Sequence, residues 1–133
     1  MSRSAIYAVN SGTQTVADGG VVSLGSVIRR YGCDCQLSGD AILLEGAGYY
    51  DITVNLVASP TAPGDITATL YKDGVAIPGA TSTGTTTAAG DFVTLSIGPM
   101  VRQMCCGSSG TMTCVLSGGE ATVSNIAVKV VKE

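Results

Sequence analysis

The chain has 133 residues, the usual length of one domain, with 7 basic and 10 acidic residues and a net charge of −3. This charge excludes a strongly basic nucleic-acid-binding protein. The absence of histidine excludes Ser-His-Asp catalysis, Cys-His catalysis and every histidine-ligated metal site. Only 13% of the residues are charged and the mean hydropathy is +0.38, which is a low charge density for the surface of a free monomer. The composition therefore favours a protein that associates with itself.

The apolar stretch at the N-terminus ends at Asn10–Gly12, too early for the hydrophobic region of a signal peptide. No apolar run approaches the roughly 20 residues that a membrane-spanning helix requires. We therefore expect a protein that is made in the cytoplasm and stays soluble, or leaves the cell by lysis or assembly. Neither a nucleic acid nor a membrane is an expected partner.

Short segments in which apolar and polar residues alternate recur along the chain, separated by Gly, Asp, Pro and Ser. Val, Thr and Gly are abundant while Lys and Glu are scarce, so helices are not expected. The pattern predicts an all-β sandwich or barrel. The expected strands are Ala5–Asn10, Thr13–Ala17, Val21–Leu24, Cys33–Leu37, Ala41–Leu44, Tyr49–Ala58, Asp65–Lys72, Val75–Ile77, Phe92–Ile97, Thr111–Leu116 and Ala121–Val131.

Two of these strands show which side chains share a face. From Tyr50 to Leu56 every second residue is apolar, and the residues between them are Asp, Thr and Asn. In the last strand, Ala127 and Val131 share with Lys129 the face opposite an all-aliphatic one. A strand that is partly apolar on its second face is typical of one that is covered on both sides. Ala127 and Val131 are therefore candidates for a contact between subunits.

Two segments carry turn and loop signals. Asp73-Gly74 lies between two alternating arms and predicts a tight hairpin, because Gly readily adopts the positive φ of a primed turn. Residues 81–90 (TSTGTTTAAG) are small and of low complexity. They are interpreted as an exposed, mobile loop, with an extended strand on a subunit surface as the alternative.

The five cysteines are Cys33, Cys35, Cys105, Cys106 and Cys114. The Cys-x-Cys and Cys-Cys pairs make the first four candidates for zinc ligands, although structural zinc sites usually use a wider spacing. Buried thiols that pack as small hydrophobic side chains are the favoured interpretation, with Cys33, Cys35 and Cys114 in the core. Disulfides are the second alternative, but an odd number of thiols cannot all pair internally. No cofactor and no catalytic residue are expected.

Arg29-Arg30-Tyr31 is the only local cluster of cations. It is too small for a nucleic-acid-binding patch, and no second patch supports one. A solvated loop is one interpretation. The alternative is a contact with a neighbouring subunit or partner, because the guanidinium group presents a planar fork to carboxylates. Arg29 and Arg30 are therefore the candidates for a partner contact.

Three stretches together resemble one family: Gly48–Val54 (GYYDITV), Leu70–Val75 (LYKDGV) and Gly119–Val128 (GEATVSNIAV). The order of a Gly-x-Tyr strand, a Gly-containing hairpin and a closing strand is similar to that of C1q/TNF-like jelly rolls. The likeness extends over residues 5–131. The C-terminal domains of BclA-like spore-surface glycoproteins, and small virion proteins of phages that infect Gram-positive bacteria, look alike.

The resemblance implies a jelly-roll sandwich of eight to ten strands that assembles as a homotrimer. Residues 1–133 are expected to form a single domain that begins with a short N-terminal segment, residues 1–4. It also implies that Tyr50, the tyrosine of the Gly-x-Tyr pattern, lies near the subunit contact. Two features depart from the family. Phe92 is the single phenylalanine and tryptophan is absent, and no collagen-like stalk precedes the domain.

The missing stalk favours a capsid-bound module over a spore filament. The expected function is therefore that of a non-enzymatic structural protein on a particle surface, most simply a phage capsid decoration or head-fibre protein located in the virion. Its expected partners are its own copies and the major capsid protein or another virion protein, with host-surface glycans as a further possibility. The alternative is a carbohydrate-binding or adhesive head of a bacterial spore or cell surface.

Overall fold

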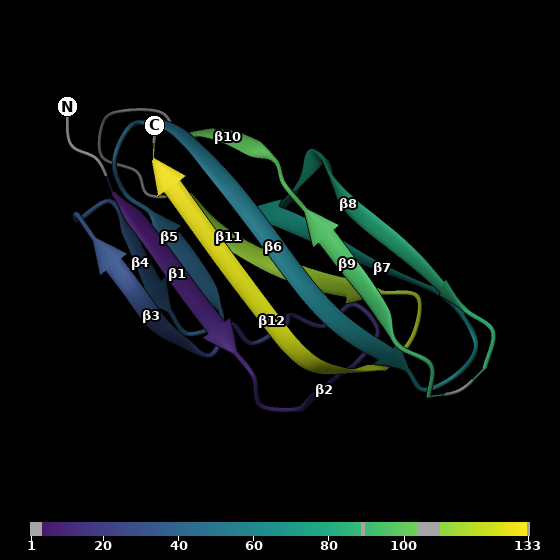
Figure 1. Ribbon diagram of the computed structural model, residues 1–133. Coiled ribbons are helices and arrows are strands. Elements are labelled where there is room, and N and C mark those ends of the chain that lie inside the picture. The colour runs from purple at the N-terminus through teal and green to yellow at the C-terminus, as the bar shows by residue number, and fades with distance from the viewer. Residues whose placement is uncertain (1–3, 89, 104–109, 133) are drawn as a thin grey trace.

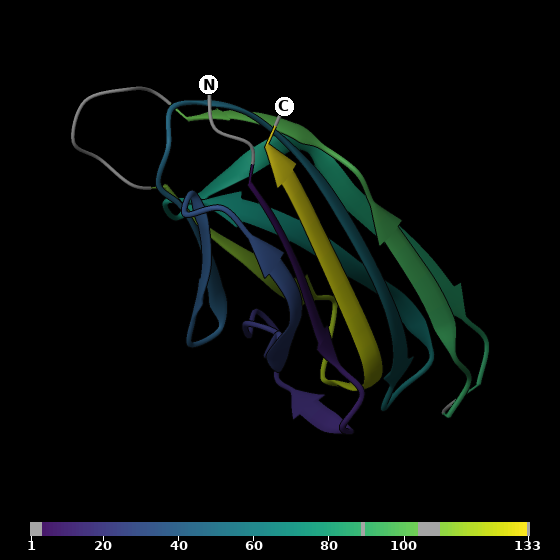
Figure 2. The ribbon, with the colours of Figure 1, turned by 60° about the vertical axis from the view of Figure 1, so that its left-hand side comes forward.

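The computed structural model describes residues 4–88, 90–103 and 110–132, and every regular element among them is a β-strand. The strands form two sheets that pack face to face (Figure 1, Figure 2). Sheet A contains β1 (Ala5–Asn10), β2 (Gln14–Val16), β3 (Ser26–Tyr31), β6 (Gly48–Pro60), β9 (Val93–Ile97), β10 (Met100–Gln103) and β12 (Ala121–Lys132). Sheet B contains β4 (Cys35–Ser38), β5 (Ala41–Leu44), β7 (Gly64–Lys72), β8 (Val75–Thr86) and β11 (Gly110–Ser117).

The order of strands is β10-β6-β12-β1-β3 in sheet A, where β2 also pairs with β12 and β9 with β6, and β4-β5-β11-β7-β8 in sheet B. This arrangement is the jelly-roll fold, so the predicted all-β fold class is confirmed. The described chain contains twelve strands where the resemblance implied eight to ten. Among the described residues there is no helix long and apolar enough to cross a membrane.

The long pairing of β6 with β12 forms the centre of sheet A and runs from Ala121 opposite Pro60 to Lys132 opposite Tyr50. β6 alternates strictly between buried and accessible side chains, and β12 does so on either side of an irregularity at Ser124 and Asn125. The buried faces of the two sheets meet in one hydrophobic core, which includes Ile6, Leu24, Ile42, Tyr50, Ile52, Leu56, Ile66, Leu70, Leu95, Met112, Leu116, Ile126 and Val130.

The predicted hairpin at Asp73-Gly74 is confirmed. Lys72 pairs with Val75, and the two residues between them have positive φ angles, 55° at Asp73 and 81° at Gly74. Positive φ at both central positions is the requirement of a type I′ turn. The Asp73 carboxylate also accepts a hydrogen bond of 2.9 Å from the amide of Thr111, so this turn is joined to the start of β11.

The loop interpretation of residues 81–90 is wrong for residues 81–86, which continue β8 along β7. Threonine has a high preference for strands, and its hydroxyl adds cross-strand hydrogen bonds. The hydroxyls of Thr67 and Thr83 lie 2.9 Å apart, and Thr85 donates to Asp65 over 2.6 Å. These contacts order a segment that offers little apolar area.

Two further predictions need correction. Residues Val21–Leu24 do not form a strand, because their strand-like pairing is limited to a single bridge between Val21 and Val115. The Arg29-Arg30 cluster does not lie in a loop, because Ser26–Tyr31 pairs with β1 as strand β3. The sequence of β3 lacks the alternation that identified the other strands, because every one of its side chains is exposed.

Candidate functional surfaces and polar network

The outer face of sheet A, on the side away from sheet B, carries several of the sequence-predicted candidates. The register aligns the outward residues of neighbouring strands in rows. One row is Asp51, Val131, Ala5 and Tyr31, the next is Thr53, Lys129, Tyr7 and Arg29, and a third is Asn55, Ala127, Val9 and Ser26. The sheet therefore brings the predicted candidates Ala127, Val131 and Arg29 onto one face.

Apolar and aromatic side chains on this face remain accessible in the single chain. Tyr7 is 38% and Tyr31 58% exposed, and Ala127 and Val131 are half-buried by their cross-strand neighbours. Lys129 is exposed between them. A partly apolar face of this kind can be covered by a second copy, and the contact predicted for Ala127 and Val131 stays a prediction.

Tyr50 lies inside the single chain, and its expected place near the subunit contact stays a prediction. Its exposed fraction is 0%, and it shares the inward face of β6 with Ile52 and Val54. The physical reason is the period of two along the strand, which turns the adjacent Tyr49 outward, at 51% exposure. Tyr49 is thus the accessible tyrosine of the Gly-x-Tyr-Tyr stretch.

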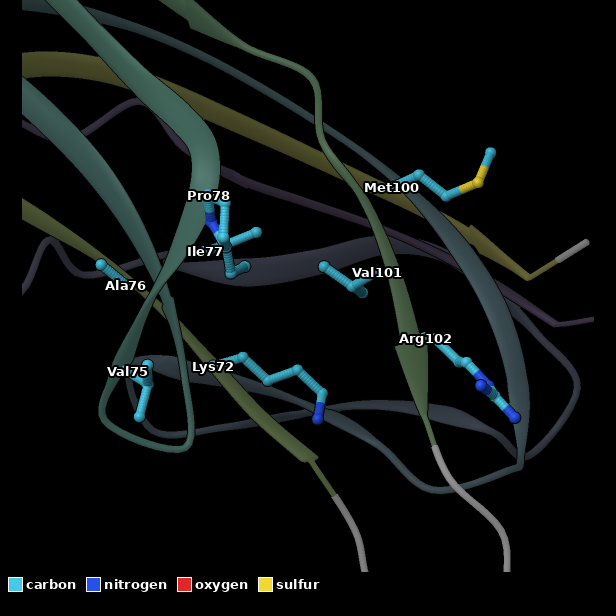
Figure 3. Close-up of a pocket in the computed structure, with 8 residues that line it drawn as sticks. All are labelled: Lys72, Val75, Ala76, Ile77, Pro78, Met100, Val101 and Arg102. Carbon is cyan, nitrogen blue, oxygen red and sulfur yellow. The ribbon is translucent and has the colours of Figure 1, made fainter.

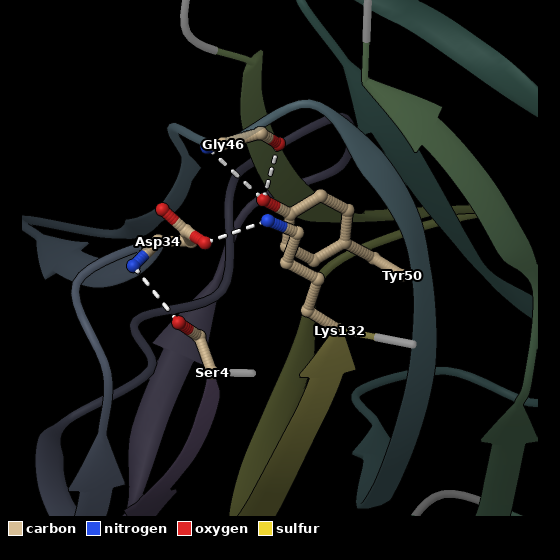
Figure 4. A network of polar contacts seen from close by, with 5 residues as sticks. All are labelled: Ser4, Asp34, Gly46, Tyr50 and Lys132. Carbon is tan, nitrogen blue, oxygen red and sulfur yellow. Dashed lines mark hydrogen bonds and ion pairs between the residues drawn. The ribbon is translucent and has the colours of Figure 1, made fainter. Parts of the chain in front are cut away.

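Two neighbouring sets of polar contacts, one at Tyr50 and one that joins Ser4 and Lys132 through Asp34, lie close to both ends of the described chain (Figure 4). The Tyr50 hydroxyl donates to the Gly46 carbonyl over 2.5 Å and accepts from the Gly46 amide over 3.1 Å. The Lys132 ammonium forms an ion pair of 2.7 Å with the Asp34 carboxylate. The Asp34 amide donates to the Ser4 hydroxyl, and the Lys132 amide donates to the Ser4 carbonyl.

Burial changes the pKa of Tyr50 and makes the charges of Lys132 and Asp34 depend on each other. Loss of solvation raises the pKa of Tyr50 to about 12, although the bond with Gly46 acts in the opposite direction. Lys132 is buried and Asp34 is largely so, and their opposite charges compensate each other inside the sandwich. Gly46 leaves the space they need, because a Cβ there would lie 2.5 Å from the Asp34 carboxyl carbon. The two sets of contacts therefore act as a structural clamp.

The burial of Lys132 has a sequence signal, which is its position in the alternation of β12. Lys132 continues the inward positions Ile126, Val128 and Val130 of β12, so the period of two places a lysine in the core. A buried lysine requires a carboxylate partner. Asp34 is 98 residues away, and no local pattern identifies it.

A groove of about 330 Å³ lies between the β7–β8 hairpin and β10, at the margin where both sheets end (Figure 3). Ile77 of β8 and Val101 of β10 point toward one another across it. No sequence-predicted candidate lies there, because β10 was not predicted as a strand. The residues that line it are Lys72, Val75, Ala76, Ile77, Pro78, Met100, Val101 and Arg102, which include no carboxylate, hydroxyl or thiol.

The three described cysteines are all free thiols. Cys35 and Cys114 are buried, as predicted, whereas Cys33 is exposed in the connection between β3 and β4, so its core assignment is wrong. Burial raises the pKa of Cys114 to about 12, and burial together with the nearby Asp34 raises that of Cys35 to about 11. Cys105 and Cys106 lie outside the described residues.

The zinc hypothesis rested on four thiols, two of which are not described. Within residues 4–88, 90–103 and 110–132, no three Cys, Asp or Glu side chains come together as a metal-binding group. Cys33 and Cys35 differ in exposure, one lying at the surface and the other in the core.

Arg29 and Arg30 border a hollow of about 220 Å³ on the outer side of β1, β3 and β12. It is lined by Ala5, Ile6, Tyr7, Arg29, Arg30, Tyr31, Lys129 and Val131. Three cationic residues thus contribute to the lining of a mainly apolar depression, and no carboxylate-bearing residue does. The hollow has a charge that suits an acidic group.

Comparison with known proteins identifies the fold. No family model and no curated protein sequence matches the chain. Murine APRIL is similar in structure, with a TM-score of 0.76, 10% identity and coverage of 99% of this chain and 100% of that one. The globular domain of the zebrafish complement 1qA protein has a TM-score of 0.65, 10% identity and coverage of 92% and 94%.

PRD1 vertex protein P5 is also similar, with a TM-score of 0.66, 14% identity and coverage of 97% of this chain and 96% of that one. These proteins have TNF/C1q-like jelly-roll domains, and this chain has the same fold over nearly its whole length. The more specific likeness to BclA-like spore-surface domains stays a prediction.

Proposed function

We propose that this protein is a non-enzymatic structural module that assembles as a homotrimer and is displayed on a particle surface, as a phage capsid decoration or head-fibre protein of the virion. The observation that carries the proposal is the outer face of sheet A, where Tyr7, Ala127 and Val131 are accessible or half-buried around few charges. Closed cyclic association would bury such a face.

The placement on a particle is supported by the shared fold with PRD1 vertex protein P5, a phage protein. The low charged fraction, 13%, also suits a protein whose surface is largely covered in an assembly. In this proposal the partners are other copies of the chain and the major capsid protein or another virion protein, and Arg29 and Arg30 are the candidates for that second contact.

Immunogold electron microscopy tests the location. Antibodies raised against the purified protein are applied to particles and to cells from the culture that produces it. Gold at regular positions on the particle heads is the expected result. Gold on spores or cell surfaces would support an adhesive head, and label on no particle would contradict the proposal.

An adhesive or carbohydrate-binding head remains the second candidate because three tyrosines, Tyr7, Tyr31 and Tyr49, are exposed on sheet A. Aromatic rings of this kind can stack against sugar rings, since one end of the side chain is apolar and the other polar. A glycan array decides between the two functions. Binding of a defined glycan that is lost in Tyr31→Ala would favour the adhesive head.

A further inference from the structure

Strand β3 differs from every other strand of the described chain, because none of its side chains is buried or half-buried. It lies at the end of sheet A and pairs only with β1 (Figure 1). Ile28 is 54% exposed, and Val27 and Tyr31 are also accessible. An exposed strand edge with apolar side chains is a template for pairing with another strand. The arrangement indicates that β3 is covered by another chain in the functional assembly.

The charges of β3 define what kind of chain fits. Arg29 and Arg30 are exposed, and both are among the residues that line the hollow beside β3, as is Lys129. The ion pairs of the described chain, Lys72 with Asp73 and Lys132 with Asp34, use none of these three cations. Arg29 pairs in register with Tyr7 and Arg30 with Ile6, so neither arginine has an acidic cross-strand neighbour on β1.

We propose that β3 is a docking strand that binds an extended, acidic peptide segment of the particle protein on which this module is displayed. The segment adds to the free edge of β3, where main-chain hydrogen bonds supply affinity and alternate side chains supply specificity. Arg29 and Arg30 are adjacent in β3 and point to opposite faces of the sheet. Carboxylates at two adjacent positions of the peptide therefore lie against the two arginines, and its apolar side chains cover Ile28 and Tyr31. The identity of the peptide's source rests on the proposed function, whereas the addition of a strand to β3 does not.

The docking strand is compatible with the homotrimer. The strand order of sheet A places β1 between β3 and β12, so β1 and β3 both lie between β12 and a segment added to β3. The trimer contact proposed around Ala127 and Val131 lies on the face of β12. One module can therefore use its sheet face for self-association and its sheet margin for docking.

Three fluorescein-labelled synthetic peptides test the proposal on the full chain. In the first, pairs of adjacent glutamates alternate with valine and threonine, so that carboxylates lie on both faces of the added strand. In the second, lysine replaces glutamate; in the third, proline replaces alternate residues of the acidic peptide. Fluorescence anisotropy is expected to show binding of the acidic peptide that is at least tenfold tighter than that of the other two. Proline cannot donate to a ladder, so equal binding of the acidic and proline peptides would overturn strand addition.

Matched variants locate the site. Arg30→Glu should weaken binding of the acidic peptide at least tenfold, whereas Arg102→Glu, the same charge change at the opposite margin of sheet A, should change it less than twofold. Equal losses in the two variants would mean attraction by overall charge and would contradict the proposal. Hydrogen exchange should show new protection of amides in β3, and protection at β8 or β10 instead would also overturn it.

The outcomes separate this inference from the proposed function. Binding of the acidic peptide to β3 without gold on particles would leave the docking strand in place and remove the particle as its source. Gold on particles without peptide binding would refute the docking strand and retain the displayed module.

Discussion

At the scale of single residues, burial decides which side chains of this protein can react. Cys33 lies in an exposed connection, whereas Cys35 and Cys114 are enclosed by the two sheets. The thiolate is the reactive form of cysteine, and burial raises the pKa of both enclosed thiols well above neutral pH.

Labelling of the native protein with iodoacetamide at pH 7.5 should therefore modify Cys33 rapidly and leave Cys35 and Cys114 unmodified until a denaturant is added. Peptide mapping by mass spectrometry measures each site separately. Rapid native labelling of Cys114 would contradict its burial. Cys33→Ser serves as the control that removes the fast site among the three described cysteines.

The same burial makes stability depend on alkaline pH. The Cys114 thiol has an ordinary pKa of 9.0, which is raised to about 12 in the fold. Below the ordinary pKa the thiol is protonated in both states and its contribution is complete. Between these two values unfolding releases a proton, so the free energy of unfolding falls as pH rises, by up to about 1.4 kcal/mol per pH unit.

Denaturant titrations between pH 8 and pH 11 measure this slope. Cys114→Val keeps an apolar side chain of similar size and removes the ionisable group, so the slope should become shallower. Cys35 and Tyr50 have raised pKa values too and should maintain part of the dependence. An identical slope in the variant would contradict the assignment to Cys114.

Tyr50 offers a test of the clamp with a matched control. Tyr50→Phe removes the hydroxyl and leaves the Gly46 amide and carbonyl without that partner, which should cost about 1–3 kcal/mol of unfolding free energy. Tyr71→Phe makes the same change on a half-buried tyrosine of the outer face of sheet B and should cost less than about 0.5 kcal/mol. Thermal melts compare them, and equal losses would refute the role of the Gly46 contacts.

At the scale of elements, the ion pair between Lys132 and Asp34 joins the end of β12 to the β3–β4 connection. A double-mutant cycle with Lys132→Met and Asp34→Asn should give a coupling energy above about 1 kcal/mol, because the pair is shielded from water. The same cycle on the exposed pair Lys72–Asp73 should give less than about 0.5 kcal/mol. Urea unfolding measures both, and a weaker coupling at Lys132 than at Lys72 would contradict the clamp.

Most strands were predictable because one of their faces is buried. Ala5–Asn10 and Ala41–Leu44 are found at their predicted limits, since alternation reports burial directly. β3 was missed because it buries no side chain and its sequence therefore carries no alternation. β8 was predicted too short because its threonines are held by cross-strand hydrogen bonds instead of apolar contacts.

A candidate surface could be predicted from the sequence only where all of its residues belong to one strand. Ala127 and Val131 belong to one alternating strand, so their common face could be predicted. The alternation of β6 correctly placed Tyr50 on the buried face, whereas its place near a subunit contact was implied by the family resemblance alone and stays a prediction. The groove of Figure 3 and the Lys132–Asp34 pair join strands that are distant in sequence, and register between such strands has no local signature.

At the scale of the whole molecule, each of the two sheets has an outer face that points away from the shared core. The outer face of sheet B carries hydrogen-bonded threonines such as Thr67 and Thr83, whereas that of sheet A carries Tyr7, Ala127 and Val131 around Lys129. This difference is the reason that we propose sheet A, and not sheet B, as the face of self-association. A charge placed at its apolar positions should therefore dissociate the assembly without unfolding the chain.

Native mass spectrometry at micromolar concentration tests this claim most directly. The account predicts a species of about three times the 13.3 kDa of one chain. Val131→Lys should convert it to folded monomer, whereas Thr69→Lys on the outer face of sheet B should leave the trimer intact. A monomeric wild-type protein, or a trimer that survives Val131→Lys and is lost in Thr69→Lys, would contradict the account.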